Sequence, residues 1–345
     1  MVNKNPIILA VESSCDDTSA AVLCGRKLLA NITATQEVHE KYGGVVPELA
    51  SRAHQANIIP VVYSAIDEAG IVVNQIDAIA FTQGPGLLGS LMVGSAFAKG
   101  FALALKIPLI SVNHLHGHIL SHFIVENEAS VIETKFPFLC LLVSGGHSQI
   151  VIVKDFLEFE ILGETIDDAA GEAFDKCAKV MGLPYPGGRE IDLLSQNGNP
   201  LAFKFGLPRI EGFNYSFSGL KTSFLYKIRD NLKINPSFIE ENKADLAASL
   251  QKAIIDILIS KLVKAVNHTG INTIALSGGV SANDGLRLKL TDLAEKNNWK
   301  VFLPNKKFTT DNAAMIAIVG LYKYKKALFS NQDITPKARM NLLDL

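Results

Sequence analysis

Residues 6–33 read PIILAVESSCDDTSAAVLCGRKLLANIT, and this stretch predicts three short β-strands joined by two polar turns. Its apolar runs have the length of strands, and the polar residues between them are typical of turns. A similar stretch begins at residue 136, where FPFLCLLVSGGHSQIVIVKDFLEFEILGETI predicts strand, glycine-rich turn, strand, turn and strand. We therefore expect a three-stranded meander in each half of the chain.

Helices and strands alternate after each meander. Buried strands such as AIAFTQGPG and TIALSGGVSAN are separated by segments with helical spacing, at about 45–70, 87–104, 243–266 and 311–326. Because the order of elements in the first half is echoed in the second, we predict two related α/β lobes with a cleft between them.

The predicted lobes have these boundaries. The first lobe spans residues 1–134, and the second spans residues 135–310 with a loop-rich insertion at 183–223. The last helix, about 311–330, is able to pack back on the first lobe.

Composition limits the classes of function. The 345 residues are 48% apolar and 19% charged, and the formal charge is −1, so a nucleic-acid partner would require a local basic patch or a second protein. The four cysteines form no CxxC pair and are typical of reduced thiols in a cytosolic protein. The N-terminus has no secretory signal pattern, and Lys99, Gly100 and Lys106 interrupt the longest apolar region. We therefore expect a cytoplasmic protein that does not span a membrane.

The segment NHLHGHILSH, residues 113–122, holds four of the eight histidines. On a helix His114, His118 and His122 would lie near one face, with His116 on the other side. Two imidazoles four residues apart can reach one metal ion, although histidines of a buried helix need not bind metal. Asp311, in FTTDNAAMIA, is a candidate third ligand, and the alternative is that it caps the last helix.

Two further interpretations concern a metalloprotease and a nucleotide-binding protein. A metalloprotease needs a glutamate beside the first histidine to act as general base, and that position is Leu115.

The turns LLVSGGHSQ and ALSGGVSAN favour a nucleotide, because backbone N–H groups of glycine loops bind phosphate, although each could be only a tight turn. No P-loop motif occurs, and GPGLLG has proline at the second position, which disfavours a dinucleotide fold.

Acidic residues gather in IDDAAGEAFDKCAK. Asp168, Glu172 and Asp175 are expected on one helical face, where they could bind sugar hydroxyls or simply face solvent.

Seven ordered motifs resemble those of the TsaD family: NHLHGHIL, LLVSGGHSQ, GETIDDAAGEAFDK, YPGG, SFSGLKT, LSGGVSAN and TDNAAMIA. The opening VESSCDDTSAAV resembles its N-terminal signature, and the resemblance covers about residues 6–330. It implies the two-lobed fold of actin, sugar kinases and chaperone ATPases (ASKHA). It also implies transfer of threonylcarbamoyl from threonylcarbamoyl-adenylate to the exocyclic amine of the adenosine beside the anticodon, in tRNAs reading codons that begin with adenine.

The resemblance also implies roles for individual residues. The metal ligands would be His114, His118 and Asp311, holding Fe2+ or, in purified protein, Zn2+ or another divalent ion. Asp16 and Asp17 would be catalytic, although Asp17 replaces the glutamate common in the family. The substrate-binding residues would be Leu142, Val143, Ser144, Gly145, Gly146, Asp175, Gly188, Asp192 and Asn283. Leu142 occupies a position where archaeal and eukaryotic relatives carry a tyrosine, so the chain resembles the bacterial type.

The implied partners are tRNA, a TsaB-like paralogue on the first lobe and a TsaE-like ATPase. The main rival is a small-molecule kinase or ATPase of the same fold, which the histidine pair disfavours because magnesium prefers oxygen ligands. A nucleotide-binding scaffold without chemistry of its own is a further alternative.

Overall fold

The computed structural model describes residues 5–127, 135–208 and 210–344. By its internal contacts the chain divides into two compact units. The first unit holds residues 1–135, 154–159 and 305–345, and the second holds residues 136–153 and 160–304. The lobe boundaries expected from the sequence stay predictions, because a division by contacts reports packing and not independent folding.

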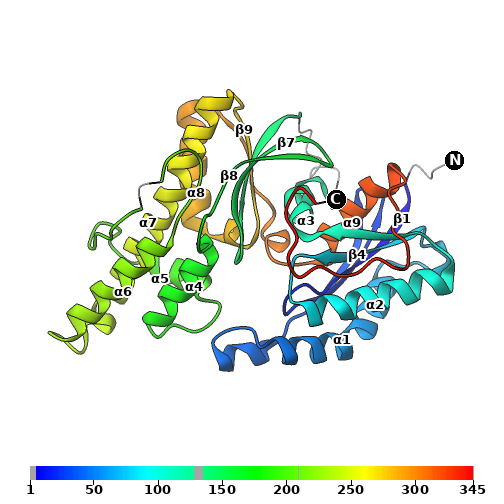
Figure 1. The fold of residues 1–345 in the computed structure, drawn as a ribbon, viewed down its shortest axis with the longest axis horizontal. Coiled ribbons are helices and arrows are strands. Elements are labelled where there is room, and N and C mark those ends of the chain that lie inside the picture. Colours follow the sequence, from blue (N-terminus) through cyan, green and yellow to red (C-terminus); the bar gives the residue numbers. More distant parts are fainter. Residues whose placement is uncertain (1–4, 128–134, 209, 345) are drawn as a thin grey trace. The chain divides into compact units, whose positions relative to one another are not determined.

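The first unit is built on a mixed five-stranded sheet with the order β3-β2-β1-β4-β5 (Figure 1). The central strand β1 pairs antiparallel with β2 and parallel with β4. Because helices cover both faces of this sheet, the side chains of β1 are buried on either face, which explains its nearly continuous apolar sequence. The strands are β1 (Ile7–Glu12), β2 (Thr18–Cys24), β3 (Lys27–Ala34), β4 (Ala78–Gly84) and β5 (Leu109–Asn113).

Helices cover both faces of this sheet. Figure 1 shows α1 (Pro47–Glu68) and α2 (Leu88–Leu105) on one face and α9 (Ala313–Lys325) on the other, and α9 contacts β1, β2 and β4. Gly320 lets α9 approach closely, since a Cβ there would lie 2.7 Å from the Cβ of Ala80. The short helix α3 (His114–Leu120) follows β5 and packs against α9.

Helix α2 lies in the longest apolar region of the sequence. Among the described residues it is the one helix long and apolar enough to cross a membrane by length and composition, a pattern that core helices share. It contacts α1 and β4, and its Ala98 and Ala102 belong to the core of the first unit.

The second unit repeats the topology of the first. Its sheet has the order β10-β9-β6-β7-β8, with β6 antiparallel to β7 and parallel to β9. The strands are β6 (Phe138–Val143), β7 (Ser148–Asp155), β8 (Glu158–Glu164), β9 (Thr273–Ser277) and β10 (Lys300–Phe302). The α/β fold class with a meander in each half is therefore confirmed.

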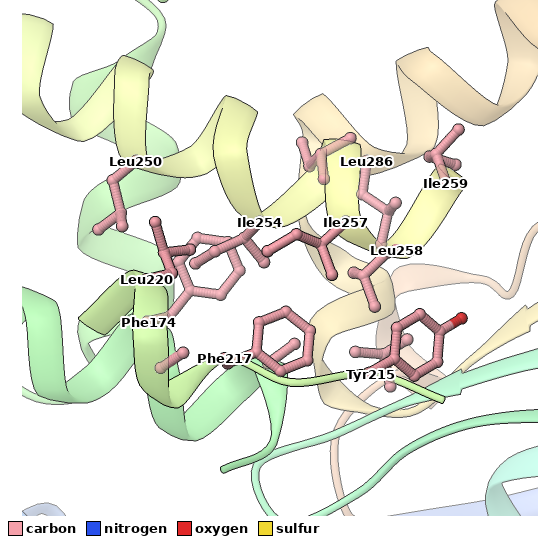
Figure 2. Close-up of a cluster of buried hydrophobic side chains, with 14 of the residues drawn as sticks. Phe174, Tyr215, Phe217, Leu220, Leu250, Ile254, Ile257, Leu258, Ile259 and Leu286 are labelled. Carbon is pink, nitrogen blue, oxygen red and sulfur yellow. The ribbon is translucent and has the colours of Figure 1, made fainter. Parts of the chain in front are cut away.

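The helices of the second unit share one large core. Figure 2 shows Phe174, Phe217 and Leu220 facing Leu250, Ile254 and Leu258 of the long helix α7. The helices are α4 (Ala170–Val180), α5 (Gly187–Ser195), α6 (Ser218–Leu232), α7 (Phe238–Thr269) and α8 (Asp284–Asn297). Helix α5 and the first residues of α6 lie inside the stretch predicted to be loop-rich. The reason is that buried Ile191 and Leu220 pack both helices into this core, despite the proline before α5 and the two glycines at its start.

The C-terminal segment, which follows α9 and comprises residues 326–344, runs along the ends of β4 and β5. The N–H of Lys337 donates to the carbonyl of Gln83, and the N–H of Gly86 donates to the carbonyl of Ala338. A Cβ on Gly84 would lie 1.9 Å from the carbonyl oxygen of Lys337, so glycine is required for this packing. The first two glycines of GPGLLG, Gly84 and Gly86, therefore make room for the protein's own backbone.

Candidate functional site

The histidine pair is presented by α3. Asn113 caps this helix, because its side-chain oxygen accepts the N–H of Leu115, and its amide nitrogen donates to the carbonyls of Asn341 and Asp344. His114 and His118 follow on one face of the helix, with ring centroids 4.7 Å apart. Both are buried, so few solvent molecules compete for their ring nitrogens.

Asp311 approaches this pair from the loop before α9. Asn312, and not Asp311, caps α9, since the Asn312 side-chain oxygen accepts the N–H of Met315 at 3.1 Å. The interpretation of Asp311 as the helix cap is therefore wrong. Its Oδ1 instead lies 3.3 Å from Nε2 of His114 and 3.3 Å from Nε2 of His118.

These three side chains fit a divalent transition metal. Their ligand atoms all lie within 4.8 Å of one another. Metal–ligand bonds of about 2.0–2.2 Å in a tetrahedral arrangement place donor atoms roughly 3.3–3.6 Å apart, close to the two nitrogen–oxygen distances observed. Two imidazoles and one carboxylate suit Fe2+ or Zn2+ better than Mg2+, and the donor set does not distinguish the first two.

The charges around the cluster favour a cation. Burial alone would lower the pKa of His114, but the carboxylates of Asp311 and Glu12 outweigh it and raise that pKa well above its ordinary value. Burial alone would raise the pKa of Asp311, but His114 and His118 hold it well below its usual range. Burial lowers the pKa of His118, which keeps its imidazole neutral and able to bind metal.

Glu12 is a residue of this site that the sequence reasoning missed. It ends β1, is 0% exposed, and its Oε2 lies 3.1 Å from Nδ1 of His114. It also accepts the N–H of Ser14 and the hydroxyl of Thr82, each at 2.5 Å. A charged residue that closes a run of buried apolar residues is the signal that could have found it.

The two aspartates expected to be catalytic lie in the turn between β1 and β2. Asp16 and Asp17 are both partly buried. Burial, followed by the charges of Asp16 and Asp311, raises the pKa of Asp17 to about 7. One carboxylate oxygen of Asp17 has no hydrogen-bond partner among the described residues. A carboxyl group with a pKa near neutrality is suited to accept or donate a proton.

His116 and His122 do not join the cluster. His116 Nε2 lies 2.6 Å from the carbonyl oxygen of Leu342, and its ring packs 4.5 Å from that of Phe159. Burial lowers the pKa of His116 to about 4. His122 lies beyond α3, in the short 3-10 helix at Ser121–Phe123, so the helical face predicted for three histidines holds only two.

The glycine loops of the second unit lie side by side. Leu142 and Val143 are fully buried in β6, so they can offer a ligand only backbone groups, and Ser144, Gly145 and Gly146 form the turn after them. Gly278, in the other loop, has a φ of +87°, and a Cβ on it would lie 2.4 Å from the carbonyl oxygen of Val143. A Cβ on Gly145 or Gly146 would meet nothing within 4 Å, so open space borders this turn.

The acidic residues of the α4 region do not form the single face predicted for them. Helix α4 begins at Ala170, so Asp168 precedes it and pairs with Lys176 and Lys221. Glu172 pairs with Lys176 as well. Asp175 is half-buried, its pKa is raised by that burial, and its Oδ1 accepts the N–H of Gly188 at 3.2 Å. Two residues expected to bind substrate, Asp175 and Gly188, are therefore in contact.

Asp192 and Asn283 are brought together by α5, α7 and α8. The Asp192 carboxylate accepts the N–H of Asp284 at 2.9 Å, and the Asn283 side-chain oxygen accepts the N–H of Leu286 at 2.8 Å. Gln251 of α7 links the start of α8 to α5. Its side-chain oxygen accepts from the amide of Asn283 at 2.6 Å, and its amide nitrogen donates to Ser195 at 2.7 Å. The sequence reasoning missed Gln251, which carries no motif. A cavity of about 540 Å³ adjoins this network and is lined in part by Asp192, Gln251 and Asp284.

Comparisons with known proteins agree with this arrangement. The sequence profile of the family described as TsaD, tRNA N6-adenosine threonylcarbamoyltransferase, matches residues 27–318 of this chain. A protein of that name from Phocaeicola vulgatus is 60% identical over 336 residues, covering 97% of this chain and 99% of the relative. One from Porphyromonas gingivalis is 58% identical over 341 residues, covering 99% of this chain and 100% of the relative.

Solved structures support the fold. HypF from T. kodakarensis superposes with a TM-score of 0.62 at 14% identity, over 97% of this chain and 50% of that one. This likeness is consistent with an ASKHA-type fold, as predicted. Since the family match and both relatives extend over most of the sequence, the chain belongs to the TsaD family of tRNA N6-adenosine threonylcarbamoyltransferases.

Proposed function

We propose that this chain transfers the threonylcarbamoyl group from threonylcarbamoyl-adenylate to the exocyclic amine of the adenosine beside the anticodon, in tRNAs that read codons beginning with adenine. Membership of the family supports the reaction and the tRNA substrate. The cluster of His114, His118 and Asp311 is the observation that carries the proposal, because it supplies the means to polarise a carbonyl or phosphate oxygen.

The reaction needs no covalent enzyme intermediate. The adenylate is a mixed anhydride, so its carbonyl carbon is already activated. The adenosine nitrogen attacks this carbon and a C–N bond forms, the C–O bond to the phosphate breaks, AMP leaves with the electron pair, and the nitrogen loses one proton. The chain must therefore hold the adenosine amine against the carbonyl carbon of the adenylate, stabilise negative charge on oxygen and accept a proton.

The roles of the first-unit residues follow from their chemistry. His114, His118 and Asp311 would hold a divalent cation, which we infer to be Fe2+; when bound, it supplies Lewis-acid stabilisation of negative charge. Asp17 is the residue best suited to accept the proton from the amine, since its pKa of about 7 lets it take up and release a proton near neutral pH. Burial is the main cause of this raised pKa, and repulsion from the neighbouring carboxylate of Asp16 adds to it.

The second-unit residues would bind the adenylate. The backbone of the turn at Leu142, Val143, Ser144, Gly145 and Gly146 is suited to its phosphate region, because the turn is bordered by open space. Asp175, Gly188, Asp192 and Asn283 would bind the remaining polar groups. The Asn283 side chain already caps α8 and donates to Gln251, so its contribution is the position of the loop as much as its own amide.

Partners follow from the family and from the surface of the first unit. A TsaB-like paralogue is proposed to dock on α1 and α2, where Ile59, Tyr63, Met92 and Leu103 are more than half exposed. A TsaE-like ATPase would complete the assembly.

A formal charge of −1 also supports a tRNA-binding surface shared with other proteins. A tRNA-modifying enzyme of this kind would act in the cytoplasm.

One assay separates this function from its rivals. The protein, with its TsaB-like and TsaE-like partners, is incubated with threonylcarbamoyl-adenylate and unmodified tRNA, and the tRNA nucleosides are analysed by mass. A threonylcarbamoyl mass increase on adenosine is expected. Unchanged nucleosides together with phosphorylation of a small molecule by ATP would favour the kinase, and cleavage of a protein substrate would favour the protease.

Matched histidine variants connect this activity to the proposed cluster. His118→Ala should lose bound metal and transfer activity together, whereas His116→Ala should keep both, because of these two histidines His118 contacts Asp311 and His116 contacts the carbonyl of Leu342. Full metal retention with lost activity in His118→Ala would contradict the proposed role of the cluster.

A further inference from the structure

The buried carboxylate of Glu12 has no role in the function proposed so far. It lies behind the histidine pair, on the side of His114 opposite to Asp311, since it contacts Nδ1 while Asp311 contacts Nε2. We propose that Glu12 is a positioning residue of the metal centre: its carboxylate fixes the tautomer and the ring orientation of His114. This inference rests on the proposed metal site and names a residue on which that site depends.

The burial of Glu12 needs an explanation. An ionised carboxylate that is removed from water destabilises a fold unless it is paired and hydrogen-bonded. Its three partners are the N–H of Ser14, the hydroxyl of Thr82 and the ring of His114. Two of these are neutral, so His114 is the partner through which the carboxylate can be linked to positive charge.

The tautomer of His114 follows from the donor and acceptor chemistry. An ionised carboxylate only accepts hydrogen bonds, so the Nδ1 atom facing Glu12 must carry the proton. In the metal-bound protein the other nitrogen, Nε2, would be the unprotonated ligand, on the side of the ring that faces Asp311, 3.3 Å away. The hydroxyl of Ser14, 3.2 Å from the same Nδ1, cannot impose this choice, because a hydroxyl both donates and accepts.

The second histidine has no such support. Nδ1 of His118 makes no hydrogen bond within the part of the chain that the structure describes. Apart from the contact of its Nε2 with Asp311, the His118 ring is held by packing, and the second carboxylate supports His114. The two carboxylates, Glu12 and Asp311, also carry together the charge that one divalent cation neutralises.

The substitution Glu12→Gln tests the proposal. It keeps the shape of the side chain but removes its charge, and it can place an N–H donor opposite Nδ1 of His114. That contact favours the tautomer of His114 that carries its proton on Nε2. A protonated Nε2 has no free lone pair with which to bind a metal ion. Zn2+ affinity, measured by competition with a chromophoric chelator, should fall by roughly 10- to 100-fold. Wild-type affinity in a folded Glu12→Gln protein would overturn the proposal.

A control separates this role from a general effect on the fold. Thr82→Val removes another hydrogen bond of Glu12 but leaves its charge and its contact with His114, so Zn2+ affinity should stay within about threefold of wild type, well short of the loss expected for a positioning group. In a His114→Ala background, Glu12→Gln should cause no further loss, since the residue on which it acts is absent. An equal loss in both backgrounds would show that Glu12 acts through the fold.

Two readouts remain informative if Glu12→Gln folds poorly. Nitrogen NMR of the Zn2+-loaded wild-type protein should show His114 bound through Nε2 with a hydrogen-bonded proton on Nδ1, and coordination through Nδ1 would overturn the proposal. His118→Ala tests the metal site itself, because this substitution leaves Glu12 and its hydrogen bonds in place. Unchanged Zn2+ affinity in His118→Ala would remove the proposed metal site, whereas unchanged affinity in Glu12→Gln alone would remove only the positioning role.

Discussion

His116→Ala provides a sharp test of the division of labour within the histidine segment. His116 and His118 are two residues apart on the same short helix, and both are buried. The structure assigns His118 to the cluster with Asp311 and His116 to the C-terminal segment, through the contact with the carbonyl of Leu342. The substitution should therefore lower stability while leaving the metal in place.

The magnitude follows from the lost contacts. Loss of a buried hydrogen bond that leaves its acceptor unsatisfied costs about 1–3 kcal/mol. The ring also packs 4.5 Å from Phe159, and such aromatic contacts contribute about 0.5–1.5 kcal/mol. The free energy of unfolding should thus fall by about 2–4 kcal/mol, or roughly 5–10 °C in melting temperature.

Stability should also depend on pH through His116. Its pKa is about 4 in the folded protein against an ordinary value of 6.5, so the unfolded chain binds more protons between these values. Stability is therefore retained above pH 6.5 and lost as the pH falls toward 4, by up to roughly 3 kcal/mol. His116→Ala should lack this contribution.

Calorimetry and metal analysis on the same samples would check these expectations. A His116→Ala protein with a normal melting temperature but no bound metal would refute the reasoning, because it would make His116 a ligand. His118→Ala, measured beside it, should lose the bound metal.

Three further predictions concern other parts of the molecule. Leu342→Ala empties a fully buried position of the C-terminal segment, so denaturant unfolding should show a loss of about 2–4 kcal/mol, and an unchanged midpoint would count against the packing described. Gly278→Ala should abolish adenylate binding by calorimetry while metal is retained, because the new Cβ would lie 2.4 Å from the carbonyl oxygen of Val143; normal binding would remove the glycine loop from the site. The initial rate of wild-type transfer should rise as the pH passes about 7, where Asp17 ionises, whereas Asp17→Asn should be slow and independent of pH there; an identical profile would exclude Asp17 as the proton acceptor.

The fold could be predicted where burial leaves a clear pattern. The central strands β1 and β6 are covered on both sides, so their sequences are continuously apolar, and the polar turns between strands mark each meander. Helix α5 was missed because Pro186, Gly187 and Gly188 at its start are typical of a loop. Tertiary packing of Ile191 stabilises that helix, and local sequence carries no trace of such packing.

The candidate site shows the same limit. The four-residue spacing of His114 and His118 is local and is visible in the sequence. The distance of 3.3 Å to Asp311, about 200 residues later in the chain, exists only because α9 packs on the first sheet beside α3. The sequence therefore offered Asp311 only as a candidate ligand, with a helix cap as the alternative, and the family resemblance implied its role as third ligand.

Single buried polar residues are the hardest to predict. Glu12 and Gln251 belong to no repeating pattern, and their importance arises from partners on other elements. Asp168 illustrates the opposite error, because helical spacing placed it with Glu172 and Asp175, whereas the helix begins two residues after it. Boundaries of helices thus decide which acidic residues share a face.

The central claim is that one divalent cation is held by His114, His118 and Asp311. Anomalous X-ray diffraction at the metal absorption edge, on crystals of anaerobically purified protein, tests it most directly. A single peak is expected about 2.0–2.2 Å from Nε2 of both histidines and from a carboxylate oxygen of Asp311. A peak bonded to other residues, or a metal-loaded crystal in which these three side chains coordinate no ion, would contradict the account.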